Sequence, residues 1–387
     1  SIRFNMKKIV ILGSTGSIGT SALQVISRHK DKFEVIGLSA NRNAELLARQ
    51  AARFHPRILA IGEGEKYKEL KKALKRPQRV LSGIEGVSEI ASLKDADVVL
   101  MAISGADAIR PLLSAISAGK TIALANKESV VSAGKIVMSM ARTHRANIIP
   151  VDSEHNSILQ CINKENMDNI ARVFLMGTGG PLKDVSKSVF DRLKPSRILA
   201  HPVWRMGKKI SVDSATMMNK GLEVIEASYL FDIHASRIEV LIHPEAVIHS
   251  MVELRDGNVM ANLFSPDMRI PIFYALSYPE RPLSYLPRLN FHKIGRISFE
   301  KPDRKKFKSL DLCYRAAKAG GTNPACLNSA NEEAVRLYLE GKVHFTGIPD
   351  LVEKTLAKHK NVSKPSLDDI FHVIGWAREE VRRLCVG

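Results

Sequence analysis

Cysteine is scarce in this chain: 387 residues contain four, far apart and with no Cys-x-x-Cys pairing. Disulfide frameworks and structural zinc sites need paired or closely spaced cysteines, so the pattern argues against both and favours a reducing compartment. Long hydrophobic runs are absent too, since none approaches the roughly 20 residues that span a bilayer. Internal repeats are also absent, which excludes repeat architectures. We therefore expect a globular protein of two or three domains.

Acidic residues are fewer than basic ones, 40 against 58, which gives a formal net charge of +18. Such an excess attracts nucleic acid, membrane surfaces or anionic small molecules. The basic residues are dispersed, however, and no RNA-recognition motif, helix-turn-helix or zinc-finger spacing accompanies them. A nucleic-acid-binding protein stays open as a rival, but we expect a small phosphorylated ligand and no nucleic-acid or membrane partner.

The start of the chain lacks a secretory signal pattern, because it runs directly into the strand-like residues 7–12. We expect Met6 to be the natural first residue and the location to be the cytoplasm of a bacterium. A processed plastid form stays open.

The first 150 residues alternate short apolar runs with amphipathic stretches, which is typical of a parallel α/β sheet. Strands are predicted at residues 9–12, 35–39, 58–61, 98–103, 121–125 and 148–151. Further along, antiparallel strands are predicted at residues 239–242, 246–252 and 259–263. The chain is predicted to be mostly helical from about residue 304. We divide it into domains at residues 1–151, 152–278 and 304–387, with a proline-rich linker at 279–303.

A glycine-rich turn, Gly13-Ser14-Thr15-Gly16-Ser17-Ile18-Gly19, follows the first predicted strand and opens a helix. In this position small residues let the backbone approach a pyrophosphate at the helix N-terminus. The second strand then runs into Arg42 with no carboxylate, which favours NADP over NAD because an arginine suits a 2′-phosphate. A turn without ligand and a plain surface arginine are the alternatives.

Two carboxylates, Asp152 and Glu154, follow the strand at residues 148–151. If this segment is extended, both side chains face the same side, and a divalent cation would offset their repulsion. The alternative is a turn that caps the helix expected from Asn156.

Three further polar segments indicate a ligand site. Lys127 follows a strand, the turn at residues 177–181 has three glycines, and Asn219, Lys220 and Glu223 fall on one helical face. A helix cap at Lys127, a flexible glycine turn and a solvated Lys–Glu pair are the alternatives. Trp204 and Met206 suit either a lid or the core.

These segments together resemble the 1-deoxy-D-xylulose 5-phosphate reductoisomerase family. The motifs that carry the resemblance are GSTGSIG at 13–19, LANKES at 124–129, PVDSEHNSI at 150–158, GTGGP at 177–181, HPVWRMGKKISVDSATMMNKGLE at 201–223 and PDMR at 266–269. They span nearly the whole chain in the family's order. The resemblance implies a Rossmann-like NADP-binding domain, a central α+β catalytic domain with a flexible lid at about 178–208, and a C-terminal helical domain.

The resemblance also implies the site residues. The metal ligands, for Mg²⁺, Mn²⁺ or Co²⁺, would be Asp152, Glu154 and Glu223. Substrate contacts would be Lys127, Ser153, Glu154, Thr178, His201, Ser214, Asn219, Lys220 and Glu223. The catalytic residues would be Asp152, Glu154, Glu223, Lys127 and His201. NADPH contacts would be Thr15, Gly16, Ser17, Ile18, Arg42, Asn43, Asn126, Glu128 and Gly207.

By the same resemblance the chain would be a homodimer, a target of fosmidomycin, and an enzyme of isoprenoid precursor synthesis. It would rearrange 1-deoxy-D-xylulose 5-phosphate, by retro-aldol/aldol steps or an α-ketol shift, and reduce the product with NADPH. Thr178, Leu182 and Asn41 depart from the family's usual serine, phenylalanine and glycine. The rival enzyme class is an aldehyde dehydrogenase, which needs a nucleophilic cysteine such as Cys161.

Overall fold

The computed structural model describes residues 6–162, 167–204 and 206–386, which fall into two compact units. The first unit comprises residues 1–129, 137–156 and 267–286; the second comprises residues 130–136, 157–266 and 287–387. Arg205, in the motif that begins at His201, lies outside the described residues.

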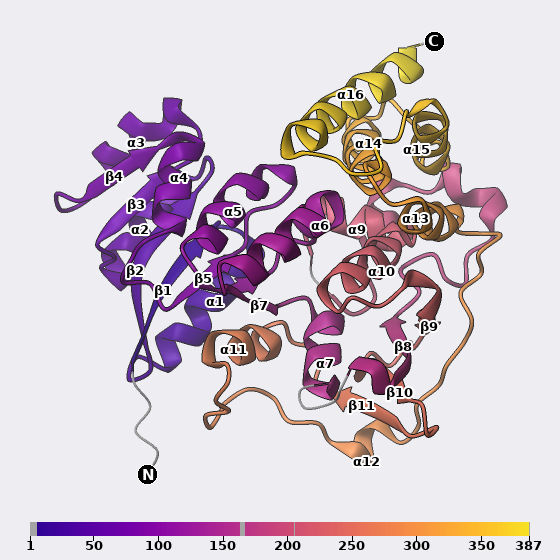
Figure 1. Ribbon diagram of the computed structural model, residues 1–387, viewed down its shortest axis with the longest axis horizontal. Helices are drawn as coiled ribbons and strands as arrows, with labels where there is room; N and C mark the ends of the chain where they lie inside the picture. The colour runs from indigo at the N-terminus through magenta and orange to yellow at the C-terminus, as the bar shows by residue number, and fades with distance from the viewer. Residues whose placement is uncertain (1–5, 163–166, 205, 387) are drawn as a thin grey trace. The chain divides into compact units, whose positions relative to one another are not determined.

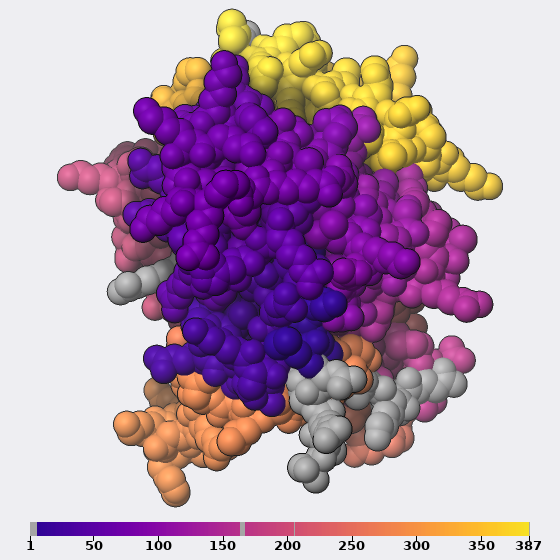
Figure 2. All heavy atoms as spheres, turned by 90° about the vertical axis from the view of Figure 1, so that its left-hand side faces the viewer, coloured from indigo at the N-terminus to yellow at the C-terminus, as the bar shows by residue number. Residues whose placement is uncertain are grey.

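The first unit is built on a seven-stranded sheet with the order β4-β3-β2-β1-β5-β6-β7, in which all neighbours are parallel. The strands are β1 (Lys7–Leu12), β2 (Phe33–Ala40), β3 (Ile58–Ile61), β4 (Arg79–Ser82), β5 (Val98–Met101), β6 (Thr121–Leu124) and β7 (Asn147–Pro150). The helices are α1 (Ser17–Arg28), α2 (Ala44–Phe54), α3 (Tyr67–Ala73), α4 (Gly83–Ala91), α5 (Ile109–Ser117), α6 (Lys127–Thr143) and α11 (Arg269–Ser277). Residues 130–136 of α6 are assigned to the second unit. The central strands are continuous apolar runs because helices cover them, and Ile9, Val10, Ile11 and Leu12 are fully buried. Residues of this unit, in indigo and purple, face the viewer in Figure 2.

This sheet confirms the Rossmann-like prediction, and each strand predicted before residue 152 belongs to it. The sequence analysis missed β4, whose four residues Arg-Val-Leu-Ser include only two apolar ones. The strand order reverses between β1 and β5, and open α/β sheets bind ligands at the carboxyl ends of strands at such a point.

Helix α11 belongs to the first unit, although the sequence-based division placed it in the segment 152–278. The ammonium of Lys7 at the start of β1 donates to the carbonyl oxygens of Ser277 and Tyr278, at 2.9 and 2.6 Å. The sequence has no local signal for this contact, because Lys7 and Ser277 are far apart in the chain. The predicted domain boundaries stay a prediction.

The second unit contains a four-stranded sheet with the order β11-β10-β8-β9. Its strands are β8 (Ile170–Gly177), β9 (Ile238–Ile242), β10 (Ile248–Leu254) and β11 (Val259–Leu263). Strand β10 is antiparallel to β8 and β11, as predicted, whereas β9 is parallel to β8. The prediction of an antiparallel β9 is wrong because a long helical crossover, and not a hairpin, joins β8 to β9.

Helices form the rest of the second unit (Figure 1). They are α8 (Pro195–Leu199), α9 (Lys208–Ala215), α10 (Met218–Leu230), α12 (Phe291–Ile294), α13 (Lys308–Ala319), α14 (Asn323–Leu339), α15 (Gly347–Lys358) and α16 (Leu367–Val386). Helix α7 (Ser153–Ile162) begins in the first unit and ends in the second. Among the described residues, no helix is both long and apolar enough to cross a membrane.

Candidate active site

The glycine turn after β1 requires glycine at two positions. Gly13 has a positive φ of 84°, and a Cβ on it would lie 2.4 Å from the carbonyl oxygen of Ala102. A Cβ on Gly19 would lie 2.4 Å from the carbonyl oxygen of Gly13, so the start of α1 packs directly on the turn. Gly16 caps α1 without a side chain, which leaves the first amides of the helix facing a ligand position. The predicted contacts Thr15, Gly16, Ser17 and Ile18 lie on this turn.

The segment after β2 holds Arg42 and Asn43. Asn43 caps α2, where its side chain accepts from the amide of Leu46 at 3.0 Å. The Nε of Arg42 lies 2.7 Å from a carboxylate oxygen of Glu63, which follows β3. The sequence analysis missed Glu63, although its place beyond the neighbouring strand was a usable signal. Asn41 does not adopt the positive φ that a glycine there would allow.

The segment after β6 holds Asn126, Lys127 and Glu128. Asn126 caps α6, and its amide nitrogen donates to Glu128 and to the carbonyl oxygen of Gly105, both at 3.0 Å. Lys127 is buried, with its Nζ 2.5 Å from the Oδ2 of Asp152. The helix cap that we weighed as an alternative is real, but it is made by Asn126 and leaves Lys127 for the carboxylate.

Asp152 and Glu154 do not lie on an extended segment, so the predicted alternation is wrong. Helix α7 begins at Ser153, which places Glu154 in its first turn and Asp152 just before it. Carboxylates suit this end of a helix because the helix dipole is positive there. Ser153 donates to Glu154 at 2.6 Å. Burial alone would raise the pKa of Asp152, but Lys127 and then His155 hold it far below its usual value.

In the second unit, the turn at residues 177–181 lies against α9 and α10. A Cβ on Gly177 would lie 3.0 Å from the side chain of Lys220, and one on Gly180 would lie 2.7 Å from the carbonyl oxygen of Ser214. Only a turn of glycines can approach both helices this closely. The glycine turn is thus packed rather than flexible, and it brings Thr178 to the same place as Ser214 and Lys220.

Helix α10 presents Asn219, Lys220 and Glu223 as predicted. The two oxygens of Glu223 bind the Nδ2 of Asn219 at 2.6 Å and the Nζ of Lys220 at 2.5 Å. Lys220 and Glu223 are 6% and 1% exposed, so the alternative of a solvated pair is wrong. A buried ion pair is costly unless further hydrogen bonds satisfy it, which is typical of a functional site.

His201 faces Thr178, with 3.1 Å between its Nε2 and the hydroxyl. Its Nδ1 accepts from the amides of Val203 and Trp204, at 3.2 and 2.8 Å, so the proton of the neutral ring is on Nε2. Burial, and then the charge of Lys220, lower the pKa of His201 to about 4. His201 is therefore a neutral donor at pH 7.

Comparison with known proteins shows the family of the chain. The profile described as 1-deoxy-D-xylulose 5-phosphate reductoisomerase matches residues 9–134, and its C-terminal domain profiles match residues 148–231 and 263–380. Reductoisomerases of that name from Caldanaerobacter subterraneus subsp. tengcongensis and Chlorobium phaeovibrioides are each 46% identical, over 98% and 97% of this chain and 99% and 98% of theirs.

The chain belongs to the 1-deoxy-D-xylulose 5-phosphate reductoisomerase family.

Solved structures of reductoisomerases superpose on nearly the whole chain. The Zymomonas mobilis enzyme in complex with NADPH has a TM-score of 0.92 at 41% identity, with 98% of this chain and 99% of that one covered. A reductoisomerase in complex with NADPH, fosmidomycin and magnesium has a TM-score of 0.92 at 38% identity, with 98% of each chain covered.

The rival enzyme class, an aldehyde dehydrogenase, needs a cysteine thiolate as its nucleophile, and Cys161 is the candidate. All four cysteines are free thiols, and burial raises the pKa of Cys161 to about 11. Its thiol contacts the carbonyl oxygen of Met260 at 3.8 Å. A thiol with a raised pKa is a poor nucleophile at neutral pH, so the surroundings of Cys161 do not support a thiohemiacetal mechanism.

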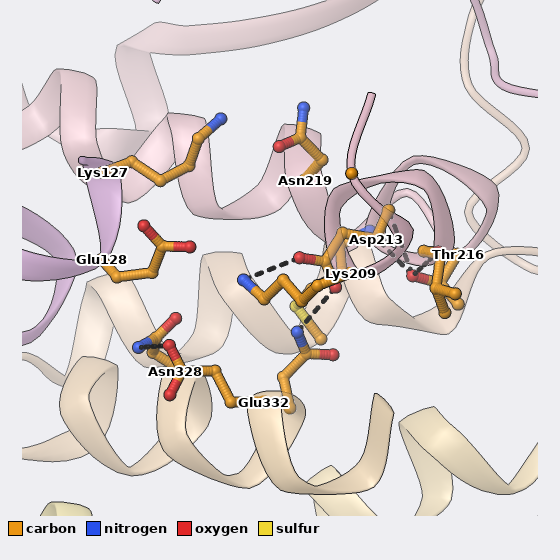
Figure 3. A network of polar contacts seen from close by, with 12 residues as sticks. Lys127, Glu128, Lys209, Asp213, Thr216, Asn219, Asn328 and Glu332 are labelled. Atoms are coloured by element: carbon orange, nitrogen blue, oxygen red, sulfur yellow. Dashed lines mark hydrogen bonds and ion pairs between the residues drawn. The ribbon is translucent and has the colours of Figure 1, made fainter. Parts of the chain in front are cut away.

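Asp213 is a residue of the site region that the sequence analysis missed. It lies buried on α9, next to Ser214, and binds the Nζ of Lys209 and the Nδ2 of Asn331, both at 2.8 Å (Figure 3). Gly207, a predicted NADPH contact of this reductoisomerase family, caps the same helix. Asp213 thus holds α9 on α14, and Asn331 had no sequence signal because it is distant in the chain.

The predicted lid at residues 178–208 is not uniform in structure. Its first part is anchored within the second unit: Lys183 binds Glu300 at 2.9 Å, Phe190 stacks on Phe307, and Asp191 accepts from Thr346 at 2.6 Å. Leu182 is fully buried. Trp204 and Met206 are half-buried, so their burial does not distinguish a place in a lid from a place in the core. The next helix, α8, is also packed, because Ile198 is fully buried and α8 contacts α9. The lid stays a prediction.

Proposed function

We propose that this chain converts 1-deoxy-D-xylulose 5-phosphate into 2-C-methyl-D-erythritol 4-phosphate, a step toward isoprenoid precursors, with NADPH and a divalent metal. The observation that carries the proposal is the combination, in a chain of this family, of a nucleotide turn with buried, lysine-paired carboxylates in each unit. A dehydrogenase without a metal step would not need carboxylates of this kind.

Asp152, Glu154 and Glu223 are the proposed metal ligands. Carboxylate oxygens suit hard cations such as Mg²⁺ and Mn²⁺, and the pKa of Asp152 is low enough to keep it ionised at any physiological pH. A metal held by them would act as a Lewis acid on the carbonyl and hydroxyl oxygens of the substrate. Lys127 and Lys220, each on one of these carboxylates, balance the charge of the ligand set and stand ready to contact substrate oxygens.

The phosphate end of the substrate is assigned to the second unit. Lys220 supplies the positive charge, and the hydroxyls of Thr178 and Ser214 with the amide of Asn219 supply neutral donors. Because His201 is uncharged, it donates one hydrogen bond through Nε2 without competing for the metal ligands. Ser153 is the proposed contact at the other end, where it already orients Glu154.

NADPH is assigned to the turn after β1, where its pyrophosphate meets the amides at the start of α1. The cofactor supplies the hydride that reduces the rearranged aldehyde. Arg42 would meet the 2′-phosphate through its two terminal nitrogens, because the contact with Glu63 uses only its Nε. Asn43, Asn126, Glu128 and Gly207 are the remaining proposed contacts.

We further propose that the chain acts as a homodimer in the bacterial cytoplasm, because its relatives at this identity are bacterial reductoisomerases.

The decisive experiment is NADPH oxidation with 1-deoxy-D-xylulose 5-phosphate before and after chelation of divalent metal. We expect turnover that chelator abolishes and Mg²⁺ or Mn²⁺ restores, with 2-C-methyl-D-erythritol 4-phosphate as the product. Fosmidomycin should inhibit and should lose affinity when metal is removed. Chelator-resistant turnover, or NADPH oxidation without this product, would refute the proposal.

A further inference from the structure

A cavity of about 110 Å³ lies in the second unit, and none of the proposed substrate contacts lines it. Three parts of the chain line it: the anchored lid segment with Lys187 and Phe190, the residue Thr216 between α9 and α10, and the first turns of α13 and α15. Its volume is several times what one water molecule needs. Neither the proposed chemistry nor cofactor binding uses this cavity.

The polar lining of the cavity is suited to an anion. Helices α13 and α15 both begin at the cavity, and neither N-cap residue makes a side-chain capping hydrogen bond. The positive ends of two helices of 12 residues lie at the cavity. At the start of α15 the carboxylate of Asp191 already accepts from the amide and the hydroxyl of Thr346, at 2.9 and 2.6 Å, so the start of α13 is the end that an external anion would meet.

Lys187, Lys306 and Lys308 add positive charge and Asp350 negative charge. Lys308 forms ion pairs with Asp350 and Glu353. Lys187 and Lys306 therefore supply most of the positive charge that an anion in the cavity would meet.

A buried hydroxyl points to a missing partner. Ser309 lines the cavity at 1% exposure, and its Oγ has no hydrogen-bond partner among the residues that the structure describes. A buried hydroxyl without a partner costs about 1–3 kcal/mol, so such groups are rare unless a ligand or water satisfies them. Ser309 is therefore an observation independent of the two helix ends.

The other walls are aromatic. Phe190 stacks on Phe307 at 6.1 Å and meets Phe345 edge-on at 5.6 Å. The ammonium of Lys306 lies over two of these rings, at 5.7 and 5.2 Å, and donates to the carbonyl oxygen of Lys183. An ammonium has three donors, and with one of them on Lys183 the other two can bind an oxyanion at this apolar wall.

We propose that this cavity binds a phosphate group, either free or carrying a small apolar substituent. A tetrahedral oxyanion has enough acceptors to meet the Ser309 hydroxyl, the two lysines and the helix amides together, whereas the aromatic walls suit the substituent.

Occupancy of the cavity reaches the proposed active site through α10. Thr216 accepts from the amide of Met218, the first residue of α10, at 3.3 Å, and it lies beside Asp213 in Figure 3. A Cβ on Gly221, next to Lys220, would lie 3.6 Å from the carbonyl oxygen of Ser309. A ligand on Ser309 and Thr216 would therefore contact two residues that pack against the turn of α10 that carries Asn219 and Lys220. We expect it to change the KM for substrate; this part alone rests on the proposed function.

The test measures thermal unfolding of the full chain with inorganic phosphate or isopropyl phosphate against chloride at equal ionic strength. Lys187→Ala and Ser309→Ala are compared with wild type, and Lys305→Ala is the control, because Lys305 is an exposed neighbour that does not line the cavity. We expect the dissociation constant for phosphate to rise at least fivefold in the two cavity variants and to stay unchanged in the control.

None of these variants changes Lys220 or Arg42. Phosphate binding at the substrate or NADPH positions is therefore the same in the wild type and the three variants, and it does not contribute to the differences between them. Tighter binding of isopropyl phosphate than of inorganic phosphate would identify a phosphate monoester as the ligand, and the reverse would identify free phosphate. If Ser309→Ala fails to fold, Lys187→Ala alone decides. Equal phosphate dependence in Lys187→Ala, the control and wild type would overturn the proposal, whatever the outcome of the activity assay.

Discussion

At the scale of single residues, each unit contains a largely buried lysine–carboxylate ion pair. A lysine assigned to the substrate pairs at 2.5 Å with a carboxylate assigned to the metal: Lys127 with Asp152, and Lys220 with Glu223. Each pair is largely buried, where an isolated charge would be costly. In the first unit the charge of Lys127 lowers the pKa of Asp152, and in each unit the pairing places an ammonium group beside a proposed metal ligand. Changing one member therefore disturbs both chemistry and stability.

Glu223→Gln removes a proposed metal ligand and leaves the ammonium of Lys220 without its carboxylate. We expect turnover to fall at least a thousandfold and the free energy of unfolding to fall by about 3 kcal/mol. NADPH affinity, measured by fluorescence titration, should remain nearly intact. Glu239→Gln, on a partly exposed strand position, is the control. Near-wild-type turnover in Glu223→Gln would disprove the three-carboxylate site.

His201 predicts a pH dependence of stability. Its pKa is about 4 in the folded chain against 6.5 in a solvated histidine, so the unfolded chain binds a proton first as the pH falls. We expect the free energy of unfolding of the wild type to decrease between pH 6.5 and about 4 relative to that of His201→Gln. Chemical denaturation across this range checks the difference. Parallel profiles for the two proteins would mean that His201 titrates normally.

Arg42 and Glu63 together predict cofactor selectivity. Arg42→Ala should raise the KM for NADPH about tenfold or more and change that for NADH little, because only NADPH has the 2′-phosphate. Glu63→Gln should weaken NADPH less, since it frees the guanidinium without removing it. Arg49→Ala, on the exposed side of α2, is the control. Equal losses for both cofactors would remove the 2′-phosphate role of Arg42.

At the scale of elements, the chain places its polar groups where helices begin. Asn43, Asn126 and Gly207 are cap residues of α2, α6 and α9, and Asp152 precedes α7. The sequence analysis found these residues as motifs but assigned Glu154 to an extended segment. Over the three residues 152–154, an extended strand and the start of a helix predict the same sequence of polar residues. The sequence could not distinguish the two, and the backbone conformation in the structure did.

The C-terminal helices predict a second, independent stability effect. Glu333 on α14 binds Arg336 on its own helix and Arg382 on α16, each at 2.6 Å. Burial alone would raise the pKa of Glu333, but these two arginines lower it to about 2. Its stabilisation is therefore present above pH 4.5 and is lost as the pH falls toward 2.

Glu333→Gln should cost about 1–3 kcal/mol of unfolding free energy at pH 7 and progressively less at lower pH. Denaturant titrations at pH 7 and pH 3 measure the difference. Glu379→Gln, exposed on α16, is the control. A cost that does not change with pH would show that the arginines do not stabilise the ionised carboxylate.

At the scale of the whole molecule, the basic residues behind the net charge of +18 are dispersed along the chain and do not gather in one sequence motif, and many of them form ion pairs. Arg42, Lys127, Lys183 and Lys220, for example, each pair with a carboxylate. This dispersion suits the attraction of small phosphorylated ligands better than the tracking of a nucleic-acid backbone.

The proposed homodimer predicts a mass in solution of about twice the 42.8 kDa of one chain. Light scattering after size-exclusion chromatography at micromolar concentration checks it. A mass of 42.8 kDa across the concentration range used in the activity assay would show that one chain suffices.

The sequence by itself determined the family, the parallel sheet, the nucleotide turn and the identity of the candidate site residues. Each of these depends on local patterns, such as apolar runs, glycine spacing and long motifs, that lie within a short stretch of chain. The tertiary structure alone decided that β9 is parallel, that Glu63 meets Arg42, and that Asp213 binds Asn331. It also assigned the terminal nitrogens of Lys127 and Lys220 to particular carboxylate oxygens and fixed the proton of His201. These contacts join residues by packing and not by proximity in the chain, so no local pattern encodes them.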